Sequence, residues 1–374
     1  MSMKIGIPKE TGFNETRVAL VPISVRALVD QGYEVYVEKD AGLQAGFSDE
    51  LYIEAGASIL PSAEKLYSAA ILIVKVKEFA SVDLELLSDK HIILAFFNLN
   101  SRREFTQKLM STRATCIAYE HVVENNEAYV LRAMSGICGK MAVQKASEAM
   151  QFNANGRGKL LASLPGIEKT TIAILGAGHA GFSAAEFAVR NGNRVYIFDQ
   201  NHKKLEHTYQ LLGPYITTLP ASSYHFKKIL PQTDVIIGAV HRPYCKTPTI
   251  INKEMLQLVS PGSVIVDLTV DHGGCIETIR PTSLEDPFYE INGIIYCAIP
   301  NMPAAVPHTS SLALNGAIYP ITVRLAKYGL DHCVKKYEDI RNGMQLLHGR
   351  VVSENLANVM QEKLFNLDAL TLDE

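Results

Sequence analysis

The stretch 171–200, TIAILGAGHAGFSAAEFAVRNGNRVYIFDQ, constrains the fold of this chain more than any other part of it. It opens with an apolar, β-branched run at 172–175, which is typical of a buried parallel strand. A helical pattern at 182–190 and a second strand at 195–198 follow. Between the first strand and the helix stand three glycines at the G-x-G-x-x-G spacing: Gly176, Gly178 and Gly181. The stretch therefore predicts a βαβ unit of the Rossmann kind.

Each part of this unit has a physical reason. Gly176 permits a tight turn, Gly178 lets the backbone approach a pyrophosphate, and Gly181 lets the helix pack closely on the strand. The amides at the helix start face the phosphates. Asp199 lies 23 positions after Gly176, where a carboxylate accepts hydrogen bonds from ribose hydroxyls. Because a carboxylate also repels a 2′-phosphate, we expect NAD as the cofactor.

Length and charge limit the alternatives. A chain of 374 residues with 47% hydrophobic residues is long enough for two domains. Its net charge of −3 gives no electrostatic reason for a nucleic-acid or anionic-membrane partner. No apolar run reaches about 18 residues, and the first residues, MSMKIGIPKE, lack the apolar core of a signal peptide. We expect a soluble cytoplasmic protein that acts on a small molecule.

The cysteines do not form a recognisable motif. None belongs to a C-x-x-C pair, and no two histidines have the spacing of metal ligands. We expect reduced, mostly buried thiols and no metal site. The six cysteines are Cys116, Cys138, Cys245, Cys275, Cys297 and Cys333.

The first part of the chain also predicts an α/β arrangement, but without a glycine fingerprint. A strand at 4–7, a helix at 22–31 and a strand at 34–38 are expected to bind something other than the dinucleotide. Lys75 lies in a further apolar strand at 70–76, and burying its ammonium without a partner would be costly. Lys75 therefore either meets an anion or reaches water from a strand end.

Long helices and further strands complete the predicted layout. Helices are expected at 132–152 and 310–325, and strands at 91–97 and 114–120. After the βαβ unit, strands at 235–240 and 263–268 continue a doubly wound parallel sheet. Polar residues at the carboxyl end of the last strand, Asp267 and Asp271, are site candidates, because ligands bind at that edge of open sheets. Asp267 could equally cap a neighbouring loop.

Several strings spread along the chain resemble the alanine dehydrogenases, within the group that includes the cofactor-binding subunit of nicotinamide nucleotide transhydrogenase. The resemblance implies a Rossmann NAD domain, residues 131–304, inserted into an α/β substrate domain, residues 1–130 and 305–374, and joined to it by long helices. It also implies a homo-oligomer, hexamer or dimer, and reversible oxidative deamination of L-alanine, a reaction of amino-acid catabolism. The strings are IGIPKE, ETRVAL, LIVKVKE, GSVIVDLTVDHGGCIET, NMPAAVPHTSSLAL and HGRVVSENLA.

The resemblance also implies roles for single residues. Arg17 and Lys75 correspond to the groups that bind the substrate carboxylate and carbonyl, and Asp271 corresponds to the catalytic aspartate. An arginine fork fixes the orientation of a carboxylate, while a lysine polarises a carbonyl or imine. Met134 and Asn301 line the substrate pocket. Expected cofactor contacts, besides the glycines and Asp199, are Ser135, Lys204 and Val240.

The sequence departs from the family pattern at several of these places. Asn98 stands where the family has its general acid/base histidine, and an amide cannot take up and release a proton near neutral pH. His272, beside Asp271, is a possible substitute proton carrier or a plain loop histidine. The other departures lie in the same regions: Gly136 for an acid, Ala221 for a serine, His272 for glutamine and His308 for arginine.

Three hypotheses therefore stay open. In the first, the protein is an NAD-dependent alanine dehydrogenase, or a close relative acting on a small L-amino acid. Asp271 and bound water then handle the proton transfers, and Lys75 and Asn98 are the other catalytic residues. In the second, a related dehydrogenase reduces an imine formed between an amine and a 2-oxo acid, as opine-type enzymes do. In the third, the protein binds NAD(H) without catalysis, although retention of Arg17, Lys75 and Asp271 argues against this.

Overall fold

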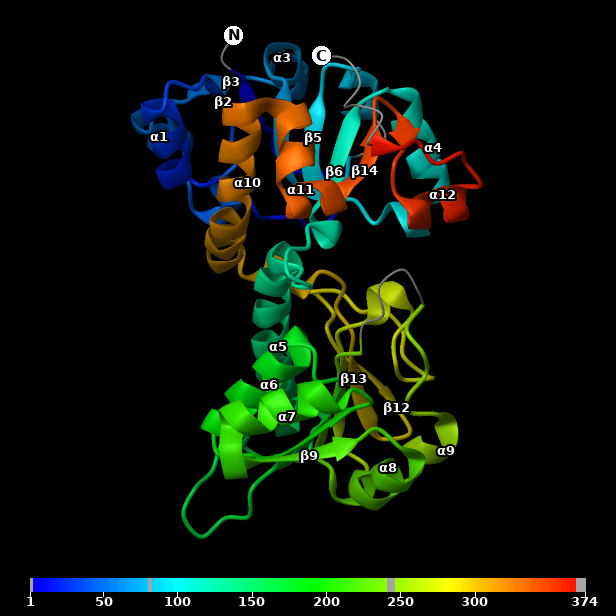
Figure 1. Cartoon of the computed structure of the whole chain (residues 1–374). Helices are drawn as coiled ribbons and strands as arrows, with labels where there is room; N and C mark the ends of the chain where they lie inside the picture. Colours follow the sequence, from blue (N-terminus) through cyan, green and yellow to red (C-terminus); the bar gives the residue numbers. More distant parts are fainter. Residues whose placement is uncertain (1–2, 80–82, 241–245, 368–374) are drawn as a thin grey trace. The chain divides into compact units, whose positions relative to one another are not determined.

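The structure is a computed structural model that describes residues 3–79, 83–240 and 246–367. The chain divides into two compact units (Figure 1): unit 1 comprises residues 1–134 and 304–374, and unit 2 comprises residues 135–303. The first crossing between the units lies inside helix α5 (Tyr129–Ala149), and the second lies in the 3₁₀ turn η9 (Met302–Ala305). We describe each unit by itself.

Unit 1 contains an eight-stranded sheet with the order β15-β14-β6-β5-β4-β1-β2-β3. Neighbours from β6 to β3 are parallel, whereas β14 is antiparallel to both β6 and β15. The predicted strands are present, each shorter than its apolar run. Their bounds are β1 Ile5–Ile7, β2 Val35–Glu38, β3 Ser58–Leu60, β4 Leu72–Lys77, β5 Ile92–Phe96, β6 Thr115–Ala118, β14 Met344–Leu347 and β15 Arg350–Val351.

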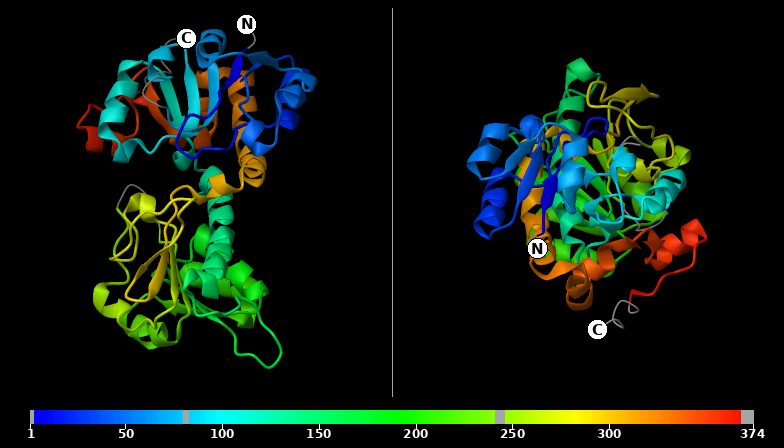
Figure 2. Two further views of the ribbon diagram at one scale, coloured as in Figure 1. Left: turned by 180° about the vertical axis from the view of Figure 1, so that it is seen from behind. Right: turned by 90° about the horizontal axis from the view of Figure 1, so that it is seen from above.

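Helices flank this sheet, and α10 and α11 lie across one of its faces (Figures 1 and 2). The predicted helix at 310–325 belongs to α10, which runs further in both directions and is kinked at Gly329, where φ is +77°. Only glycine adopts this backbone geometry readily. The helices of the unit are α1 Pro22–Asp30, α2 Asp49–Glu54, α3 Ala63–Ala69, α4 Arg103–Ser111, α10 Pro307–Lys336, α11 Glu338–Gly343 and α12 Glu354–Met360.

Unit 2 contains a seven-stranded sheet with the order β12-β13-β11-β10-β7-β8-β9. Numbered by position in the chain, its six parallel strands follow the order 3-2-1-4-5-6 of the Rossmann fold, and β12 is an antiparallel edge strand. All five residues of β7 are buried, as predicted for a central parallel strand. The strands are β7 Thr171–Leu175, β8 Arg194–Asp199, β9 Ile216–Pro220, β10 Val235–Gly238, β11 Val264–Asp267, β12 Tyr289–Ile291 and β13 Ile294–Cys297.

The helices of unit 2 include α6, which begins at the glycine turn. The predicted helix at 132–152 is α5, which starts and ends three residues earlier than expected. No helix in the described ranges is both long and apolar enough to cross a bilayer. The other helices are α6 His179–Arg190, α7 His202–Leu212, α8 Ser223–Ile229 and α9 Lys253–Leu256.

Candidate active site

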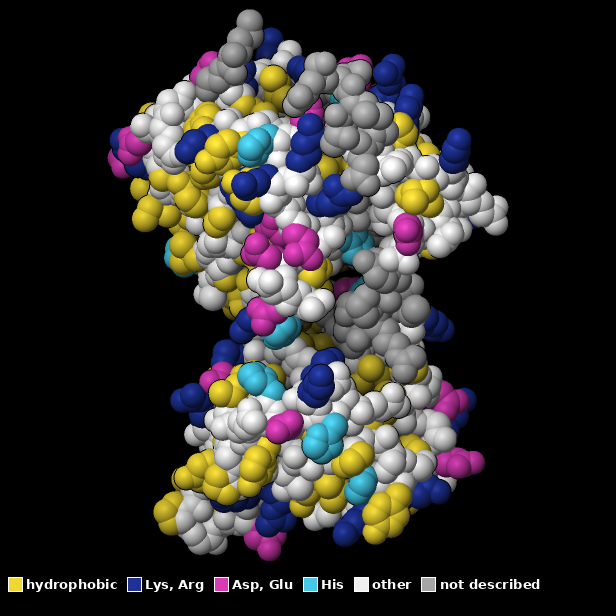
Figure 3. Space-filling view, viewed as in Figure 1, with side chains coloured by type: hydrophobic (Ala, Val, Ile, Leu, Met, Phe, Trp, Pro, Cys, Tyr) yellow, Lys and Arg dark blue, Asp and Glu magenta, His cyan; other side chains and the backbone are white. Residues whose placement is uncertain are grey.

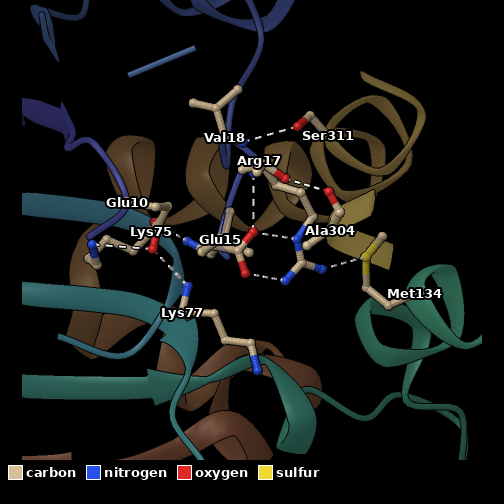
Figure 4. A network of polar contacts seen from close by, with 11 residues as sticks. Glu10, Glu15, Arg17, Val18, Lys75, Lys77, Met134, Ala304 and Ser311 are labelled. Atoms are coloured by element: carbon tan, nitrogen blue, oxygen red, sulfur yellow. Dashed lines mark hydrogen bonds and ion pairs between the residues drawn. The ribbon is translucent and has the colours of Figure 1, made fainter. Parts of the chain in front are cut away.

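Charged side chains gather in unit 1 where β1 and β4 end. Lys75, on β4, is fully buried, which rules out the alternative of a lysine that reaches water from a strand end. Its Nζ lies 3.4 Å from a carboxylate oxygen of Glu10, which follows β1 in the chain (Figure 4), and 5.3 Å from the centre of the Phe79 ring. Lys75 therefore meets an anion, as the other alternative predicted.

A local irregularity in the sheet places Lys75 here. The pairing of β4 with β5 shifts register between Val74 and Lys77. Bulges of this kind leave backbone groups unpaired and redirect side chains. The freed amides of Val76 and Lys77 donate to the Glu10 carboxylate at 2.8 and 3.3 Å. Glu10 thus holds both the bulge and the ammonium of Lys75.

Glu10 is surrounded by polar atoms that lack partners. Burial raises the pKa of the Glu10 carboxyl, Lys75 opposes this shift, and the nearby charge of Glu15 adds to it. Three of the buried side-chain atoms that make no hydrogen bond among the described residues lie near Glu10: Nζ of Lys75 and the hydroxyls of Tyr67 and Tyr119. Burial raises the pKa of both hydroxyls, and the nearby charge of Glu10 adds to the shift. Buried polar groups without partners are costly, so this region is suited to a polar ligand.

Arg17 is also buried and paired. Its Nε and one terminal nitrogen donate to the two carboxylate oxygens of Glu15 at 2.7 and 2.5 Å (Figure 4). The other terminal nitrogen lies 3.1 Å from the sulfur of Met134. A methionine sulfur is a weak acceptor. The structure thus brings Arg17 and Met134 into contact.

The segment that carries Arg17 is fixed to helix α10. The amide of Val18 donates to the Ser311 hydroxyl, and the amide of Val21 donates to the Asn315 side chain, both at 3.0 Å. Ser311 is fully buried. Two of the strings that carry the family resemblance, ETRVAL and NMPAAVPHTSSLAL, are therefore in contact in the folded chain.

Asn98 follows β5 and has a left-handed backbone, with φ +52° and ψ +41°. Its amide donates to the carboxylate of Glu120 at 2.7 Å, and the amide of Phe97 donates to the same carboxylate. Because β4 and β5 are parallel neighbours, Asn98 lies at the same edge of the sheet as the carboxyl end of β4. Asn98 therefore lies just beyond its strand, outside the alternation of side chains along the sheet.

The glycine turn of unit 2 fits a dinucleotide. Gly176 has φ +100°, and a Cβ there would lie 2.6 Å from the carbonyl oxygen of Ala239. A Cβ at Gly181 would lie 1.8 Å from the carbonyl oxygen of Gly176. At Gly178 a Cβ would meet nothing within 4 Å, so this position is open. Gly176 thus forms the tight turn, Gly181 allows the close packing of the helix, and Gly178 leaves open space in front of the backbone, as the spacing predicted.

Asp199 lies beside this turn. One of its carboxylate oxygens accepts the amide of Ala177 and the other accepts the amide of Asn201, each at 2.8 Å. Each oxygen keeps acceptor capacity for a further hydrogen bond. The backbone of Val240 borders the turn on another side, since its nitrogen lies 3.1 Å from the position of a Cβ on Gly176.

The remaining predicted site residues of unit 2 lie on other elements than the glycine turn. Asp271 is exposed on a short 3₁₀ turn, η8 (Val270–His272), where the sequence predicted an irregular loop. Lys204 is exposed on α7, and Ser135 is half-buried in α5. Asn301 has a left-handed backbone with φ +54°.

Asp267 supports the loop that carries Asp271. It is fully buried and accepts hydrogen bonds from the amide and hydroxyl of Thr269 and from the amide of Cys275, all between 2.7 and 2.8 Å. Of the two alternatives for Asp267, the loop cap is therefore the one that the structure supports. Cys275 itself is a buried free thiol, as are Cys116, Cys297 and Cys333; Cys138 is a half-buried free thiol and Cys245 lies outside the described residues.

The structure explains one departure from the family pattern, His308, and leaves another, Gly136, without a steric reason. Nδ1 of His308 donates a hydrogen bond to the carbonyl oxygen of Ala45 at 2.8 Å, and the ring stacks on Phe47 with the ring centres 4.9 Å apart. It thus has a packing role in unit 1. A Cβ on Gly136 would meet only the Ser183 hydroxyl, at 3.6 Å, so nothing steric requires glycine there.

Three acids of this site escaped the sequence analysis: Glu10, Glu15 and Glu120. Glu15 and Arg17 are two residues apart, but Glu10 contacts residues 75–77, and Glu120 contacts residues 97 and 98. The only available signal was that a lysine inside an apolar strand needs an anion. That signal does not say which acid provides it.

The fold and the glycine turn define a Rossmann-type nucleotide-binding α/β protein. The chain matches the family profiles "Alanine dehydrogenase/PNT, N-terminal domain" over residues 6–138 and "Alanine dehydrogenase/PNT, C-terminal domain" over residues 142–354. An alanine dehydrogenase of Methanococcus maripaludis is 37% identical, covering 95% of this chain and 96% of the relative. One of Staphylococcus epidermidis is 35% identical, covering 100% and 99%. The chain therefore belongs to the alanine dehydrogenase/PNT family.

Solved structures agree with this membership. A structure of an L-alanine dehydrogenase superimposes with a TM-score of 0.91 and 37% identity, covering 96% of this chain and 99% of that chain. A transhydrogenase from Sinorhizobium meliloti shares the fold, with a TM-score of 0.79 and 24% identity over 94% of this chain and 99% of its own. The family similarity thus extends over both units.

Proposed function

We propose that this protein is an NAD-dependent alanine dehydrogenase. The reaction converts L-alanine, NAD⁺ and water into pyruvate, ammonium, NADH and a proton, and it is reversible. The observation that carries the proposal is the buried ammonium of Lys75, which has a carboxylate at 3.4 Å but no hydrogen-bond acceptor within the described residues. The family relatives named alanine dehydrogenase support it.

The charges around Lys75 favour a small zwitterion. Two cations, Arg17 and Lys75, are paired with two buried acids, Glu15 and Glu10. An amino acid with one carboxylate and one ammonium leaves this balance unchanged. A second carboxylate would add a buried charge without a partner, which is strongly unfavourable.

This charge balance also separates the proposal from opine-type chemistry. The product of an opine-type reduction carries two carboxylates, one from each reactant. Burial raises the pKa of Glu38, the nearby charge of Asp83 adds to this shift, and the charge of Lys75 opposes it, so further acids lie near Lys75. A monocarboxylate substrate therefore fits these residues better than a dicarboxylate does.

The residues of this chain have distinct tasks in the reaction. Arg17 orients the substrate carboxylate through the nitrogen that faces Met134, and Lys75 polarises the carbonyl oxygen or imine nitrogen. Asn98 donates a hydrogen bond to the oxygen of the carbinolamine but transfers no proton. Asp271 is the acid proposed to exchange protons with the amine and with water, and Asn301 is a further proposed contact of the substrate.

The glycine turn and Asp199 are proposed to hold NAD. When bound, the nicotinamide accepts the hydride from Cα of the amino acid. The open space at Gly178 suits a pyrophosphate, and the carboxylate of Asp199 suits an unphosphorylated ribose. Ser135, Lys204 and Val240 are further proposed contacts of the cofactor.

We also propose a cytoplasmic homo-oligomer, hexamer or dimer, that serves amino-acid catabolism, with the substrate domain in residues 1–130 and 305–374 and the NAD domain in residues 131–304. Apolar side chains are exposed on three elements of unit 1 (Figure 3). They are Ile23 on α1, Leu43 on the 3₁₀ turn η1 (Leu43–Ala45), and Leu51 and Ile53 on α2. Light scattering on the purified chain tests the oligomer, and a monomer at micromolar concentration would contradict it.

The decisive assay is NADH formation from NAD⁺ with L-alanine at alkaline pH. A panel of small L-amino acids, together with L-aspartate and L-glutamate, is run beside it. We expect turnover with L-alanine and none with the dicarboxylic amino acids. In the reverse direction, pyruvate is offered with ammonium or with a second amino acid as the amine. Reduction that requires the second amino acid would overturn the proposal in favour of opine-type chemistry.

The Asn98→His variant tests why the protein lacks the family histidine. General acid/base help is typically worth roughly 10²–10⁴-fold in rate. We expect the variant to turn over L-alanine faster than the wild type, if the ring reaches the reacting oxygen as the amide does. Absence of turnover in both proteins, with NAD⁺ still bound, would refute the proposed activity and favour a non-catalytic nucleotide-binding protein.

A further inference from the structure

Glu120 lies directly after β6 in the 3₁₀ turn η4 (Tyr119–His121) and points its carboxylate at the end of the neighbouring strand β5. One oxygen accepts the amides of Asn98 and Phe97 at 2.7 and 3.2 Å, and the other lies 3.3 Å from the amide of Phe97. These two amides are the first ones past the end of β5. The carboxylate thus takes the place of a further strand residue.

The backbone at Asn98 needs such support. Its φ of +52° lies in the left-handed region, which a side chain with a Cβ adopts at a cost of order 1 kcal/mol. Asn98 also begins the 3₁₀ turn η3 (Leu99–Ser101), since the amide of Ser101 donates to its carbonyl oxygen. Two hydrogen bonds thus flank the left-handed residue: the amide of Asn98 donates to Glu120, and its carbonyl oxygen accepts the amide of Ser101.

We propose that Glu120 is a positioning residue for the dehydrogenase reaction, and that it acts by holding Asn98 in this left-handed conformation. The inference rests on the proposed function, in which the Asn98 amide hydrogen-bonds the reacting oxygen. Glu120 touches the backbone of Asn98 and contributes through that contact.

The charge of Glu120 is not required for this role. Burial raises the pKa of its carboxyl, and its backbone hydrogen bonds and the charge of Lys77 oppose the shift. A protonated carboxyl keeps one carbonyl oxygen that accepts both amides. If Glu120 acts by positioning, its replacement should leave the pH profile of kcat unchanged. If Glu120 carried a proton, its own pKa would appear in the pH profile of the wild type and would be absent from that of the variant.

Three variants separate the possibilities. Glu120→Gln keeps one carbonyl oxygen for the two amides and removes the charge, while Glu120→Ala removes the acceptor. Asp49→Asn is the matched control, because Asp49 accepts the amide of Asp40, which also has a left-handed backbone, at 2.9 Å in the same unit. For each variant, kcat, KM for L-alanine and the affinity for NADH are measured, and thermal melting reports the fold.

We expect Glu120→Ala to lower kcat about 10- to 100-fold, in line with the loss from a misplaced catalytic group. KM for L-alanine and the NADH affinity should stay within about threefold, because the loss falls on an interaction made in the transition state. Glu120→Gln should keep kcat within a few-fold of the wild type with the same pH profile, and Asp49→Asn should change nothing. Equal losses in Glu120→Gln and Glu120→Ala would overturn positioning and indicate a proton carrier.

Amide hydrogen exchange provides a readout that does not depend on activity. In the wild type, the amides of Phe97 and Asn98 should be protected, and Glu120→Gln should retain most of that protection. Fast exchange of both amides in the folded wild type would refute the inference even if alanine turnover is confirmed. Protection without turnover on any substrate would instead refute the proposed function, and with it the catalytic part of the inference.

Discussion

The two units build their sites by different means. In unit 2 the site is made of backbone: three glycines fix a turn, and each is required by a contact or an opening that a Cβ would change. In unit 1 the site is made of two buried ion pairs, Lys75 with Glu10 and Arg17 with Glu15, and of the hydrogen bond from the Asn98 amide to Glu120. The first kind depends on spacing along the chain, and the second depends on which distant residues the fold brings together.

This difference has an energetic side. In a glycine turn, the effect of a substitution depends on what the added Cβ would contact. A Cβ that meets the protein should lower stability, whereas a Cβ that points into open space should only affect a ligand there. A buried ion pair fails through desolvation, so removing one partner is worse than removing both. The predictions below use these two properties to test the comparison.

The largest effect is expected for Lys75→Met. Loss of the ammonium removes the group that polarises the reacting carbonyl or imine, so kcat/KM for L-alanine should fall roughly 10³-fold or more. It also leaves Glu10 buried without its cation, which typically costs about 3–5 kcal/mol of stability. Steady-state kinetics and thermal melting measure the two effects, and Lys90→Met, on an exposed lysine of the same unit, is the control.

The double variant Lys75→Met with Glu10→Gln separates these effects. Since both charges are then gone, thermal stability should return toward the wild type while activity stays lost. If the double variant is as unstable as Lys75→Met, the desolvation argument for this pair is wrong. If Lys75→Met keeps wild-type activity, the proposed role of Lys75 is wrong.

In the glycine turn, stability and ligand binding should be affected by different variants. Gly178→Ala adds a methyl group into open space at an ordinary φ of −74°, so stability should be unchanged. The methyl occupies the proposed approach of the pyrophosphate, so NADH affinity should fall at least about tenfold, which is 1.4 kcal/mol. Calorimetric titration with NADH measures it, and unchanged affinity would contradict the placement of the phosphates.

Gly181→Ala is the counterpart. Its Cβ would lie 1.8 Å from the carbonyl oxygen of Gly176, so helix α6 must move away from β7. Forced overpacking typically costs about 1–3 kcal/mol, and the melting temperature should fall accordingly. A variant as stable as the wild type would show that the turn adapts more easily than this geometry implies.

A smaller effect is expected for Asp199→Ser, which addresses the cofactor itself. Removing the carboxylate removes the repulsion toward a 2′-phosphate and one ribose acceptor. We expect NADH affinity to fall about tenfold, as for the loss of one charged hydrogen bond, and the preference for NADH over NADPH to shrink. Titrations with both cofactors measure the ratio, and an unchanged ratio would refute the proposed basis of NAD selection.

The same distinction explains how far the sequence could be read. The Rossmann sheet was predictable because its central strands are fully buried apolar runs, and because Gly176, Gly178 and Gly181 have a fixed spacing. The antiparallel strands β12, at the edge of its sheet, and β14, next to the edge strand β15, were not predicted, since short strands of this kind carry no long apolar run.

In unit 1, the sequence could indicate that Lys75 needs an anion but could not identify Glu10. The two residues are 65 positions apart, and their contact depends on the adjacency of β1 and β4 in the sheet. For the same reason, the strand that precedes Asn98 was predicted, whereas the left-handed turn at Asn98 depends on Glu120 from the next strand connection. Contacts between strand ends are a property of topology, and topology is not encoded by local spacing.

A last prediction concerns His121, next to Glu120. Burial lowers the pKa of His121 from 6.5 to about 4. Between these two values the unfolded chain binds a proton that the folded chain does not, so stability falls as the pH decreases from about 6.5 to about 4. In His121→Gln this contribution is absent, so the decrease in melting temperature between pH 7 and pH 4.5 should be smaller than in the wild type. His91, whose pKa burial also lowers, is retained in both proteins and therefore cancels in the comparison.

Equal pH dependence in the two proteins would show that His121 can be protonated without opening the fold, and that burial around this strand end is less complete than the proposed support of Asn98 requires.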